Sequence, residues 1–564
     1  MRKKTTLHAC IALLMCCAYA SAETIYVSPS GKDTNDGSSW SKAFKTVQSA
    51  IYAAYPGDDV WIAAGTYYPT ETIYDEGSNY TPSVDLSENP HGKSITLQDG
   101  VNLYGGFAGN ETSLDARAKS DLNGNGLIEP WEFTNQTILT ADFNGDDKWT
   151  LNEDGTWTIE GMAENSFHVI WVPIGFADII TLDGLTVQGG GCTASVYAGL
   201  HAVHKNAGGL STNGNGTTGS DLLIQNCLFQ NNYAWTNGGA MQIQYGGNTK
   251  IKNCCFRNNK ASNQAGAIRN QAAVIEDTWF YRNEAMNGGA VYNNGGASLL
   301  DRCLVASNVS ATTGGAVLLG GQAKNCAIFN NQAQQGGGFY ATGSGARVTN
   351  CTVANNIAFT ENGGEGIFNN TPANMIINTL FWENKLQGGS VSNSAFTNSG
   401  ILYQGDETCV NNILINTQSQ VVNPTDFKGV ATNNTQLDKI LKSNWRLVEG
   451  SALINAGAFD IYVTANSLYN IPRNDEIPDI GAAEYDESSS SIATFNAEKV
   501  LPVISNNILI LCKKYQSVKL YDVSGKIALT GQNTDALALG NLAKGMYICI
   551  LENAGNRYSV KIVF

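Results

Sequence analysis

The chain has 564 residues, of which 60 are Gly and 13 are Cys, and only 15% of its side chains are charged. Soluble domains usually carry about 25% charged residues and about 7% Gly, so this composition argues against a coiled coil and against an ordinary helical enzyme. The net charge of −15 argues against binding to nucleic-acid phosphates, and 43% apolar residues exclude a disordered chain.

Residues 1–22 have the features of a signal peptide for export. A basic start at 2–4 precedes an apolar stretch at 7–20 and a small-residue cleavage site. Cys16 and Cys17 leave a lipoprotein leader open as an alternative. No later stretch has 18 uninterrupted apolar residues, so we expect no membrane-spanning segment.

The residues at about 41–55 predict an amphipathic helix, because Phe44, Val47 and Ile51 share one face. We expect this helix to cap the first layer of the following domain and to shield its exposed edge.

Residues 121–132 match a twelve-residue calcium loop, D-x-N-x-N-G-x-I-x-x-x-E. In such loops, oxygen ligands come from positions 1, 3, 5, 7 and 12, while a Gly at position 6 makes the sharp turn. Pro130 departs from a paired EF-hand, and Glu129 at position 9 is expected to bind through water. A surface loop without metal is the alternative to a structural Ca²⁺ site. The expected ligands are Asp121, Asn123, Asn125, Leu127 and Glu132.

A second acidic stretch, 142–147, is a weaker candidate for the same cation. It begins D-F-N-G-D-D and lacks Gly at the required position.

A seven-residue segment occurs seven times in the middle of the chain. Its first copy is 226–232 (N-C-L-F-Q-N-N), and later copies follow at intervals of 23 to 28 residues. A Gly-Gly-Ala mark lies between copies at 238–240, 288–290 and 314–316, with variants at 265–267 and 337–339. Every copy closes on Asn: Asn232, Asn259, Asn283, Asn308, Asn331, Asn356 and Asn384.

The apolar runs within each copy are too short and too β-branched for helices. Short strands joined by Gly and Asn turns, with one coil per ~25 residues, predict a parallel β-solenoid. Coils stack about 4.8 Å apart, so equivalent positions form columns along the axis. We therefore expect the closing Asn residues to form an amide ladder at one corner, and the Gly-Gly pairs to supply positive φ at another.

A column of cysteines follows from the same register. Small buried thiols are the simpler interpretation, and disulfides between neighbouring coils of an exported protein are the alternative. Metal binding is disfavoured because no His accompanies the column. Its members are Cys227, Cys254, Cys303, Cys326 and Cys351.

Two further columns are candidates for function. The first runs Gln225, Lys252, Glu276, Asp301, Lys324 and Thr349. It predicts a ladder of solvated ion pairs, with Lys252, Glu276, Asp301 and Lys324 as weak catalytic candidates for a polysaccharide lyase and Glu276/Asp301 as an alternative ion site. The second column carries aromatic side chains that could stack on sugar rings: Gln242, Arg269, Tyr292, Leu318 and Tyr340.

The F-x-x-N elements, together with the Gly-Gly-Ala marks, resemble the polymorphic outer membrane protein repeat. This resemblance implies a right-handed parallel β-helix of a bacterial surface protein. The segments 25–31, 37–40 and 56–58 resemble the opening of pectate-lyase-like proteins, and 451–457 and 478–484 resemble their closing segment. The resemblance covers residues 23–487 and indicates fold more than function.

After a polar linker at 488–491, residues 492–564 change to antiparallel strand patterns typical of a small β-sandwich. The stretches Y-D-V-S-G-K and L-A-K-G-M-Y resemble the C-terminal sorting domain of type IX secretion. This implies the type IX secretion machinery as a partner and secretion to the outer surface of a Gram-negative bacterium. An ordinary stabilising β-domain is the alternative. Cys512 and Cys549 are candidates for a disulfide within it.

The sequence therefore predicts an all-β secreted or surface protein with a non-catalytic binding or adhesion role towards a polysaccharide or surface glycan. The alternative is a pectate-lyase-like enzyme acting on an acidic polysaccharide. The sequence leaves open the ligand, the oligomeric state, and whether the tail is cleaved and replaced by an anchor.

Overall fold

The computed structural model describes residues 22–563 except 73–89, 192–201, 213–218, 245–247, 296, 344, 362, 370, 372–373, 385–394, 398–400, 403–420, 426, 458–464, 474–477, 486–502, 506–507, 523–525, 541 and 554–555. The predicted signal peptide and linker therefore lie outside the described residues, apart from Ala22. The chain forms two compact units, 1–487 and 488–564. No helix in the described part is both long and apolar enough to cross a bilayer.

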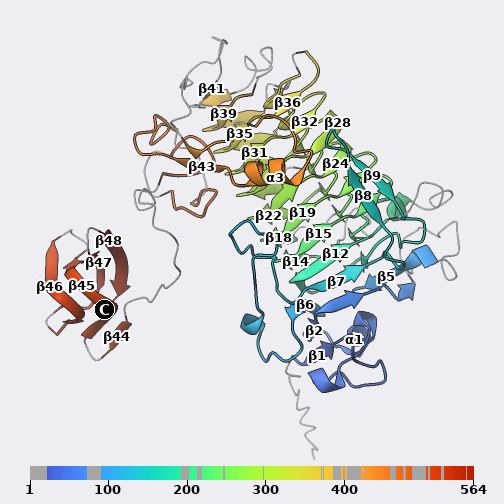
Figure 1. Ribbon diagram of the computed structural model, residues 1–564, viewed down its shortest axis with the longest axis horizontal. Helices are drawn as coiled ribbons and strands as arrows, with labels where there is room; N and C mark the ends of the chain where they lie inside the picture. Colours follow the sequence, from blue (N-terminus) through green and yellow to red (C-terminus); the bar gives the residue numbers. More distant parts are fainter. Residues whose placement is uncertain are drawn as a thin grey trace, which may run out of the picture. The chain divides into compact units, whose positions relative to one another are not determined.

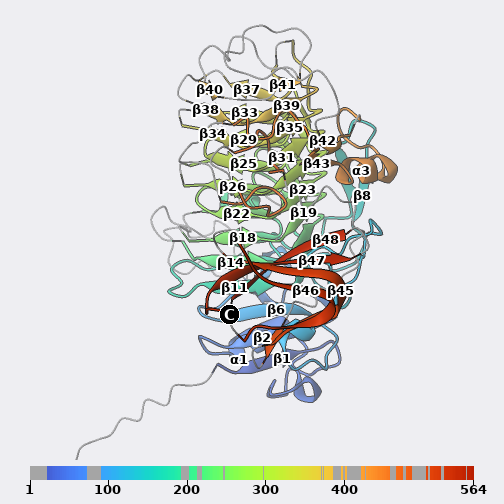
Figure 2. The same ribbon diagram turned by 90° about the vertical axis from the view of Figure 1, so that its left-hand side faces the viewer.

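The first unit is the predicted parallel β-helix, whose strands stack as rungs from β1 (Thr24–Val27) upwards (Figures 1 and 2). The coils contribute strands to four stacked sheets, which we number 1 to 4 in the order in which a full coil such as β14–β17 visits them. Only β4 pairs antiparallel to its neighbour in these sheets.

Sheet 1 has twelve strands: β1, β2 (Asp59–Ala63), β6 (Asn102–Phe107), β11 (Ile180–Asp183), β14 (Leu222–Gln225), β18 (Lys250–Lys252), β22 (Val274–Glu276), β26 (Leu299–Asp301), β30 (Gln322–Lys324), β34 (Arg347–Thr349), β38 (Met375–Ile377) and β40 (Ala395–Thr397). Sheet 2 has eleven: β3 (Gly65–Tyr67), β7 (Thr137–Thr140), β12 (Leu185–Gln188), β15 (Leu228–Gln230), β19 (Cys255–Arg257), β23 (Trp279–Tyr281), β27 (Leu304–Ala306), β31 (Ala327–Phe329), β35 (Thr352–Ala354), β39 (Leu380–Trp382) and β41 (Ile401–Leu402).

Sheet 3 has six strands: β16 (Tyr233–Ala234), β20 (Lys260–Ala261), β24 (Glu284–Asn287), β28 (Val309–Thr313), β32 (Gln332–Ala333) and β36 (Ile357–Ala358). Sheet 4 has ten: β4 (Glu71–Thr72), β5 (Lys93–Thr96), β10 (Ile170–Val172), β13 (Leu210–Thr212), β17 (Met241–Ile243), β21 (Ile268–Asn270), β25 (Val291–Asn293), β29 (Val317–Leu319), β33 (Phe339–Ala341) and β37 (Ile367–Asn369).

The interior is built from like residues stacked in register. Phe229, Phe256 and Phe280 are fully buried, and their rings stack with centroids 4.9 and 5.2 Å apart. The predicted cysteine column is buried beside them as free thiols. Each thiol donates to the carbonyl two residues earlier at 3.0–3.4 Å, so its polar hydrogen is satisfied inside the core.

The predicted Asn ladder is confirmed at the corner between sheets 2 and 3. From Asn232 to Asn356, the backbone N–H and the Nδ2 of each Asn donate to the Oδ1 of the Asn in the next coil, at 2.9–3.1 Å. All seven Asn side chains are buried. The ladder therefore pairs polar groups that close packing removes from water.

The glycine corner between sheets 3 and 4 is also confirmed, with one shift in register. Gly238, Gly288 and Gly314 have φ between +64° and +68°, as expected. In the fifth copy the positive φ belongs to Gly336, so the equivalent triplet is 336–338 rather than the predicted 337–339. At the second Gly of each pair, a Cβ would lie 2.1–2.5 Å from a carbonyl oxygen of the next coil, so side chains are excluded there.

The N-terminal cap is shorter than the predicted helix at about 41–55. A 3-10 turn, Trp40–Lys42, precedes α1 (Val47–Ala53), which begins at the N-cap Thr46. The gap between them is extended because Phe44 forms a parallel bridge with Val27. The helix still buries Val47 and Ile51 in the same core as the first strands.

Two segments outside the coils cover the outer faces of sheets 2 and 3. Residues 421–485, which include β42 (Val421–Asn423), α3 (Asn434–Leu441) and β43 (Asn444–Leu447), pack Trp445 against Phe329 and Trp382 of sheet 2. The hairpin of β8 (Lys148–Leu151) and β9 (Trp157–Glu160) lies on sheet 3, where Trp157 Nε1 donates to Arg282 O at 2.8 Å.

The closing motif 478–484 attaches this covering segment to the coils of the β-helix through hydrogen bonds and an ion pair. Asp479 Oδ1 accepts from Asn455 N at 2.7 Å, and the carbonyl of Asp479 accepts from Asn350 Nδ2 at 3.0 Å. Arg473 forms a buried ion pair with Glu484. The motif thus joins the end of the β-helix unit to its coils.

The second unit is a small antiparallel β-domain. Its strands are β44 (Val503–Ser505), β45 (Ile508–Tyr521), β46 (Ile527–Ala538), β47 (Met546–Asn553) and β48 (Asn556–Val563). Cys549 lies opposite Leu520 in the β45–β47 register, eight residues along β45 from Cys512. Cys549 is a buried free thiol, and the side chain of Cys512 lies outside the described part of this domain, so the considered disulfide stays a prediction.

Candidate functional site

The predicted calcium loop is closed at its base. Lys119 and Phe133 form an antiparallel bridge, and Ser120 N donates to Glu132 O at 3.2 Å. On one side Arg117 pairs with Asp183 of β11 at 3.0 Å. These contacts hold the segment 117–134 against the β-helix.

Within the loop, the polar side chains hydrogen-bond to the loop backbone and to Glu129. Asp121 accepts from Gly124 N at 2.7 Å and from Gly126 N at 2.8 Å. The hydrogen bond from Gly126 is the largest cause of a lowered pKa at Asp121. Asn123 Nδ2 and Asn125 Nδ2 both donate to Glu129, at 3.1 and 2.6 Å.

Glu129 and Glu132 are only 4% and 3% exposed and lie beside each other. Burial, followed by the neighbouring Glu132, raises the pKa of Glu129 to about 7. A buried carboxylate pair is costly unless a proton or a cation neutralises it. The donor set is made of oxygens, which suits a hard cation such as Ca²⁺. Glu129 accepts hydrogen bonds from both Asn side chains, and its water-mediated role at an ion stays a prediction.

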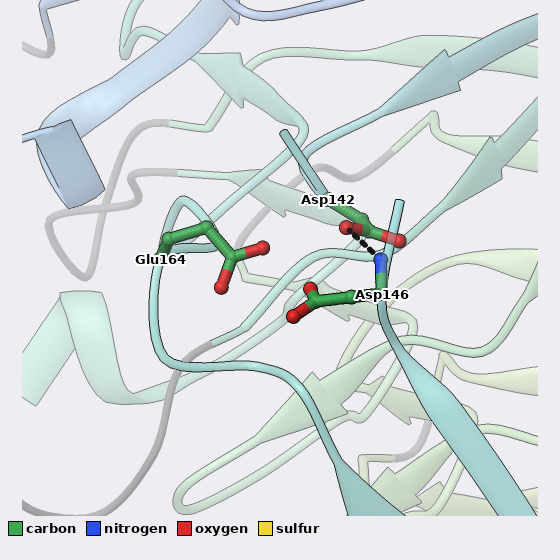
Figure 3. A group of neighbouring side chains, drawn as sticks. All are labelled: Asp142, Asp146 and Glu164. Carbon is green, nitrogen blue, oxygen red and sulfur yellow. Dashed lines mark hydrogen bonds between the residues drawn. The ribbon is translucent and has the colours of Figure 1, made fainter. Parts of the chain in front are cut away.

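A second acidic group forms around the weaker stretch. Asp142, Asp146 and Glu164 each offer one carboxylate oxygen, and these atoms lie within 4.8 Å of one another (Figure 3). Asp142 Oδ1 accepts from Asp146 N at 3.2 Å. Burial, followed by the nearby carboxylates, raises the pKa of Asp147 to about 7. Sequence reasoning missed Glu164, because it reaches this place only after the β8–β9 hairpin returns the chain.

The predicted catalytic column on sheet 1 is in register. Lys252 lies opposite Glu276, Glu276 opposite Asp301, and Asp301 opposite Lys324 on successive strands. Lys252 and Glu276 both belong to the described residues, but their nitrogen and carboxylate oxygens do not come within 4.0 Å, so the expected ion pair is not formed. Lys252 is exposed, and Asp301 is only 4% exposed.

Arg302, which was not predicted from the sequence, forms ion pairs with two carboxylates of this column and with the adjacent Asp277. Its guanidinium lies 3.7 Å from Glu276, 2.8 Å from Asp277 and 2.5 Å from Asp301. Burial raises the pKa of Asp301 to about 6, although a hydrogen bond from Asn325 and the charge of Arg302 oppose that rise. The alternative ion site at Glu276/Asp301 therefore already holds a fixed cation.

The predicted aromatic column on sheet 4 is also in register, and it continues to Phe368. The rings of Tyr340 and Phe368 are stacked, with centroids 4.9 Å apart and an interplanar angle of 2°. The guanidinium of Arg269 lies over Tyr292 at 6.0 Å. These four side chains are partly exposed, whereas Leu318 between them is buried.

Comparisons with known proteins identify the second unit. Residues 501–564 match the family model of the secretion system C-terminal sorting domain. Residues 501–564 form a sorting domain. The chain is therefore a secreted or cell-surface protein, as its tail motifs predict. The comparison with curated proteins finds no match.

Several solved structures match the chain in a structural comparison. Pectate lyase Pel9A is 14% identical, with a TM-score of 0.41, and the match covers 83% of this chain and 97% of that chain. XylC in complex with xylose is 10% identical, with a TM-score of 0.27 and coverage of 72% and 88%. The GH136 lacto-N-biosidase from Eubacterium ramulus is 10% identical, with a TM-score of 0.29 and coverage of 63% and 67%. None of these likenesses carries an activity to this chain.

Proposed function

We propose that this secreted protein binds surface glycans without cleaving them, at the outer surface of a Gram-negative bacterium, and that it reaches this surface through the type IX secretion machinery. The observation that supports the binding role best is the aromatic column on sheet 4. It places partly exposed Tyr292, Tyr340 and Phe368 on one face, with the buried Leu318 in the coil between Tyr292 and Tyr340.

The column suits a carbohydrate chain for two physical reasons. Apolar ring surface packs against the C–H faces of pyranose rings, and the phenol groups add hydrogen bonding at their tips. The column also runs along the axis with a spacing of about 4.8 Å per coil, so an extended polymer meets several side chains in turn. Arg269 adds a donor beside Tyr292.

The catalytic alternative has weaker geometric support. A lyase needs a basic group that loses its proton readily beside a cationic stabiliser for the developing enolate. Lys252 is exposed to water, and Asp301 is buried under Arg302. These residues therefore do not face one another as an acid and a base around one open position.

The loop 121–132 is proposed as a structural Ca²⁺ site within this function. The carboxylates of Asp121, Glu129 and Glu132, with the amide oxygens of Asn123 and Asn125 and the carbonyl of Leu127, would hold the ion. The ion would neutralise the buried Glu129–Glu132 pair and so fix the loop on the β-helix.

A glycan array tests the binding role. The mature protein should bind a subset of glycans, and Tyr340→Ala/Phe368→Ala should lose most of that signal. Phe359→Ala is a matched control, since this exposed aromatic lies at the end of sheet 3. Equal loss in the control, or undiminished binding by the double variant, would contradict the proposal.

A further inference from the structure

The covering segment 421–485 follows one corner of the β-helix, between sheets 2 and 3. At this corner, each repeated coil has a residue with positive φ one position before its ladder Asn. In three later coils these residues are Asn355, Asn330 and Ser307, and each hydrogen-bonds to the backbone of the covering segment at 2.6–3.0 Å. The next corner residue is Arg282, with φ at +55°. It brings a charged group to a junction that is neutral in those three coils.

Arg282 is a buried cation that uses only part of its hydrogen-bonding capacity. It is 7% exposed, and its Nη1 donates to Asn434 Oδ1 of α3 at 2.8 Å. Nε and Nη2 are buried and have no hydrogen-bond partner in the part of the chain that the structure describes. These two nitrogens form one edge of the guanidinium plane, and this edge can hold two oxygens of an anion side by side.

No carboxylate balances this charge at close range. Arg282 forms no ion pair within 4.0 Å with any described residue. Burial lowers the pKa of Arg282, Tyr281 and the exposed Asp438 of α3 oppose this change, and the charge of Arg257 adds to it. A guanidinium does not lose its proton in proteins, so a buried one is costly unless an anion pairs with it. Water would satisfy the two N–H groups but would leave the charge uncompensated.

The first turn of α3 adds further donors beside the guanidinium. The helix begins at Asn434, and its N-cap Asn433 accepts a hydrogen bond from Gln436 N at 2.9 Å. The backbone N–H groups of Asn434 and Thr435 have no acceptor among the described residues. Unpaired N–H groups and the helix dipole both favour an anion at this end of a helix. Asn434 and Thr435 are exposed, so an ion can approach Arg282 from water at this turn.

We propose that Arg282 and the first turn of α3 bind a small inorganic oxyanion, phosphate or sulfate, where the covering segment meets the β-helix. The free edge of the guanidinium would hold two of its oxygens, and the N–H groups of Asn434 and Thr435 would bind the others. A free ion suits the site better than a charged group on a polymer, because Arg282 is buried. The ion would attach α3 to the coil. This proposal does not depend on the proposed glycan binding.

Equilibrium dialysis of the mature protein against radiolabelled inorganic phosphate, in excess chloride, tests the proposal. The wild type should bind one phosphate per chain, and unlabelled sulfate should displace it. Arg282→Gln should bind phosphate at least about tenfold more weakly, because it loses the charge and the paired donors. Lys439→Gln removes an exposed cation from the same helix, and this matched control should bind phosphate like the wild type.

Asn434→Asp provides a second variant at an exposed position, in case Arg282→Gln does not fold. It places a carboxylate against Arg282, so it should fold and lose phosphate binding. Phosphate should raise the thermal midpoint of the β-helix unit in the wild type by mass action and leave that of Asn434→Asp unchanged. A wild type that binds no phosphate at millimolar concentration would overturn the proposal. Phosphate binding by Arg282→Gln or Asn434→Asp that equals the wild type would overturn it as well.

Discussion

Asn232 and Asn259 are 27 residues apart and are joined by two hydrogen bonds, since the backbone N–H and the Nδ2 of Asn232 both donate to Asn259 Oδ1 at 3.1 Å. The same pair of bonds is repeated along the ladder. Each Asn side chain therefore acts as a link between coils, and the loss of one leaves several buried groups unpaired.

Asn308→Leu should lower the free energy of unfolding of the β-helix unit by about 1–3 kcal/mol, because it leaves buried polar groups unpaired. Its Nδ2 donates hydrogen bonds to Phe280 O and Asn331 Oδ1, and its Oδ1 accepts one from Asn283 Nδ2. Denaturant unfolding measures the change. Exposed Gln334→Leu, in a neighbouring coil, is the control. Asn231 is unsuitable as a control, because it is partly buried with φ at +53°. Equal losses in both variants would show that the ladder adds nothing specific.

Calcium should raise the thermal midpoint of the β-helix unit, because an ion bound only to the folded loop stabilises it by mass action. Asp121→Ala/Glu132→Ala should abolish this rise. Asp36→Ala, at an exposed acidic residue outside the loop, should keep it. Scanning calorimetry with millimolar Ca²⁺ and with chelator measures the shift. An unchanged midpoint in the wild type would refute the site.

Acidification should destabilise the coil around His168. This side chain is fully buried, its Nδ1 lies 2.7 Å from Ala207 O, and its ring packs on Trp171 and His204. Burial, followed by His204, lowers its pKa from 6.5 to about 3. The unfolded chain therefore binds more protons between these values, and stability falls as pH drops below about 6.5.

His168→Phe should flatten that part of the stability curve, because phenylalanine keeps ring packing and cannot be protonated. Midpoints measured from pH 7 to pH 4 give the comparison, and His91→Phe is a matched substitution at a partly buried histidine. An identical pH slope in His168→Phe and the wild type would rule out His168 as the source.

Deletion of residues 492–564 should leave the β-helix folded but retained in the periplasm. The first unit has its own core, and a solenoid is stabilised by its neighbouring coils. Fractionation and surface protease accessibility measure the location. Normal amounts of the truncated protein at the surface would contradict the proposed route.

The sequence predicted the parts of this molecule that repeat. Seven closing Asn residues were enough to place a ladder, and their register also located Lys252, Asp301 and Tyr340 on the right columns. Equivalent positions in stacked coils have the same neighbours, so they require similar residues, and one irregular copy does not hide the pattern.

The parts that were missed depend on contacts made once. Arg302 occupies a left-handed corner, with φ at +52°, where five other copies have Asn and one has Asp277. Nothing in the repeat indicates that its side chain pairs with three carboxylates. Glu164 joins Asp142 and Asp146 only through the β8–β9 hairpin. The length of α1 was overestimated because Phe44 bridges to Val27 instead of continuing the helix.

One experiment measures both glycan binding and glycan cleavage by the mature protein. The glycan that the array ranks first is incubated with the mature protein and Ca²⁺, the complex is recovered, and the chain length of the glycan is determined by chromatography. We expect a recovered glycan of unchanged length, with no absorbance from unsaturated ends. Shortened products that disappear in Lys252→Ala or Lys324→Ala would contradict it and would identify the protein as a lyase.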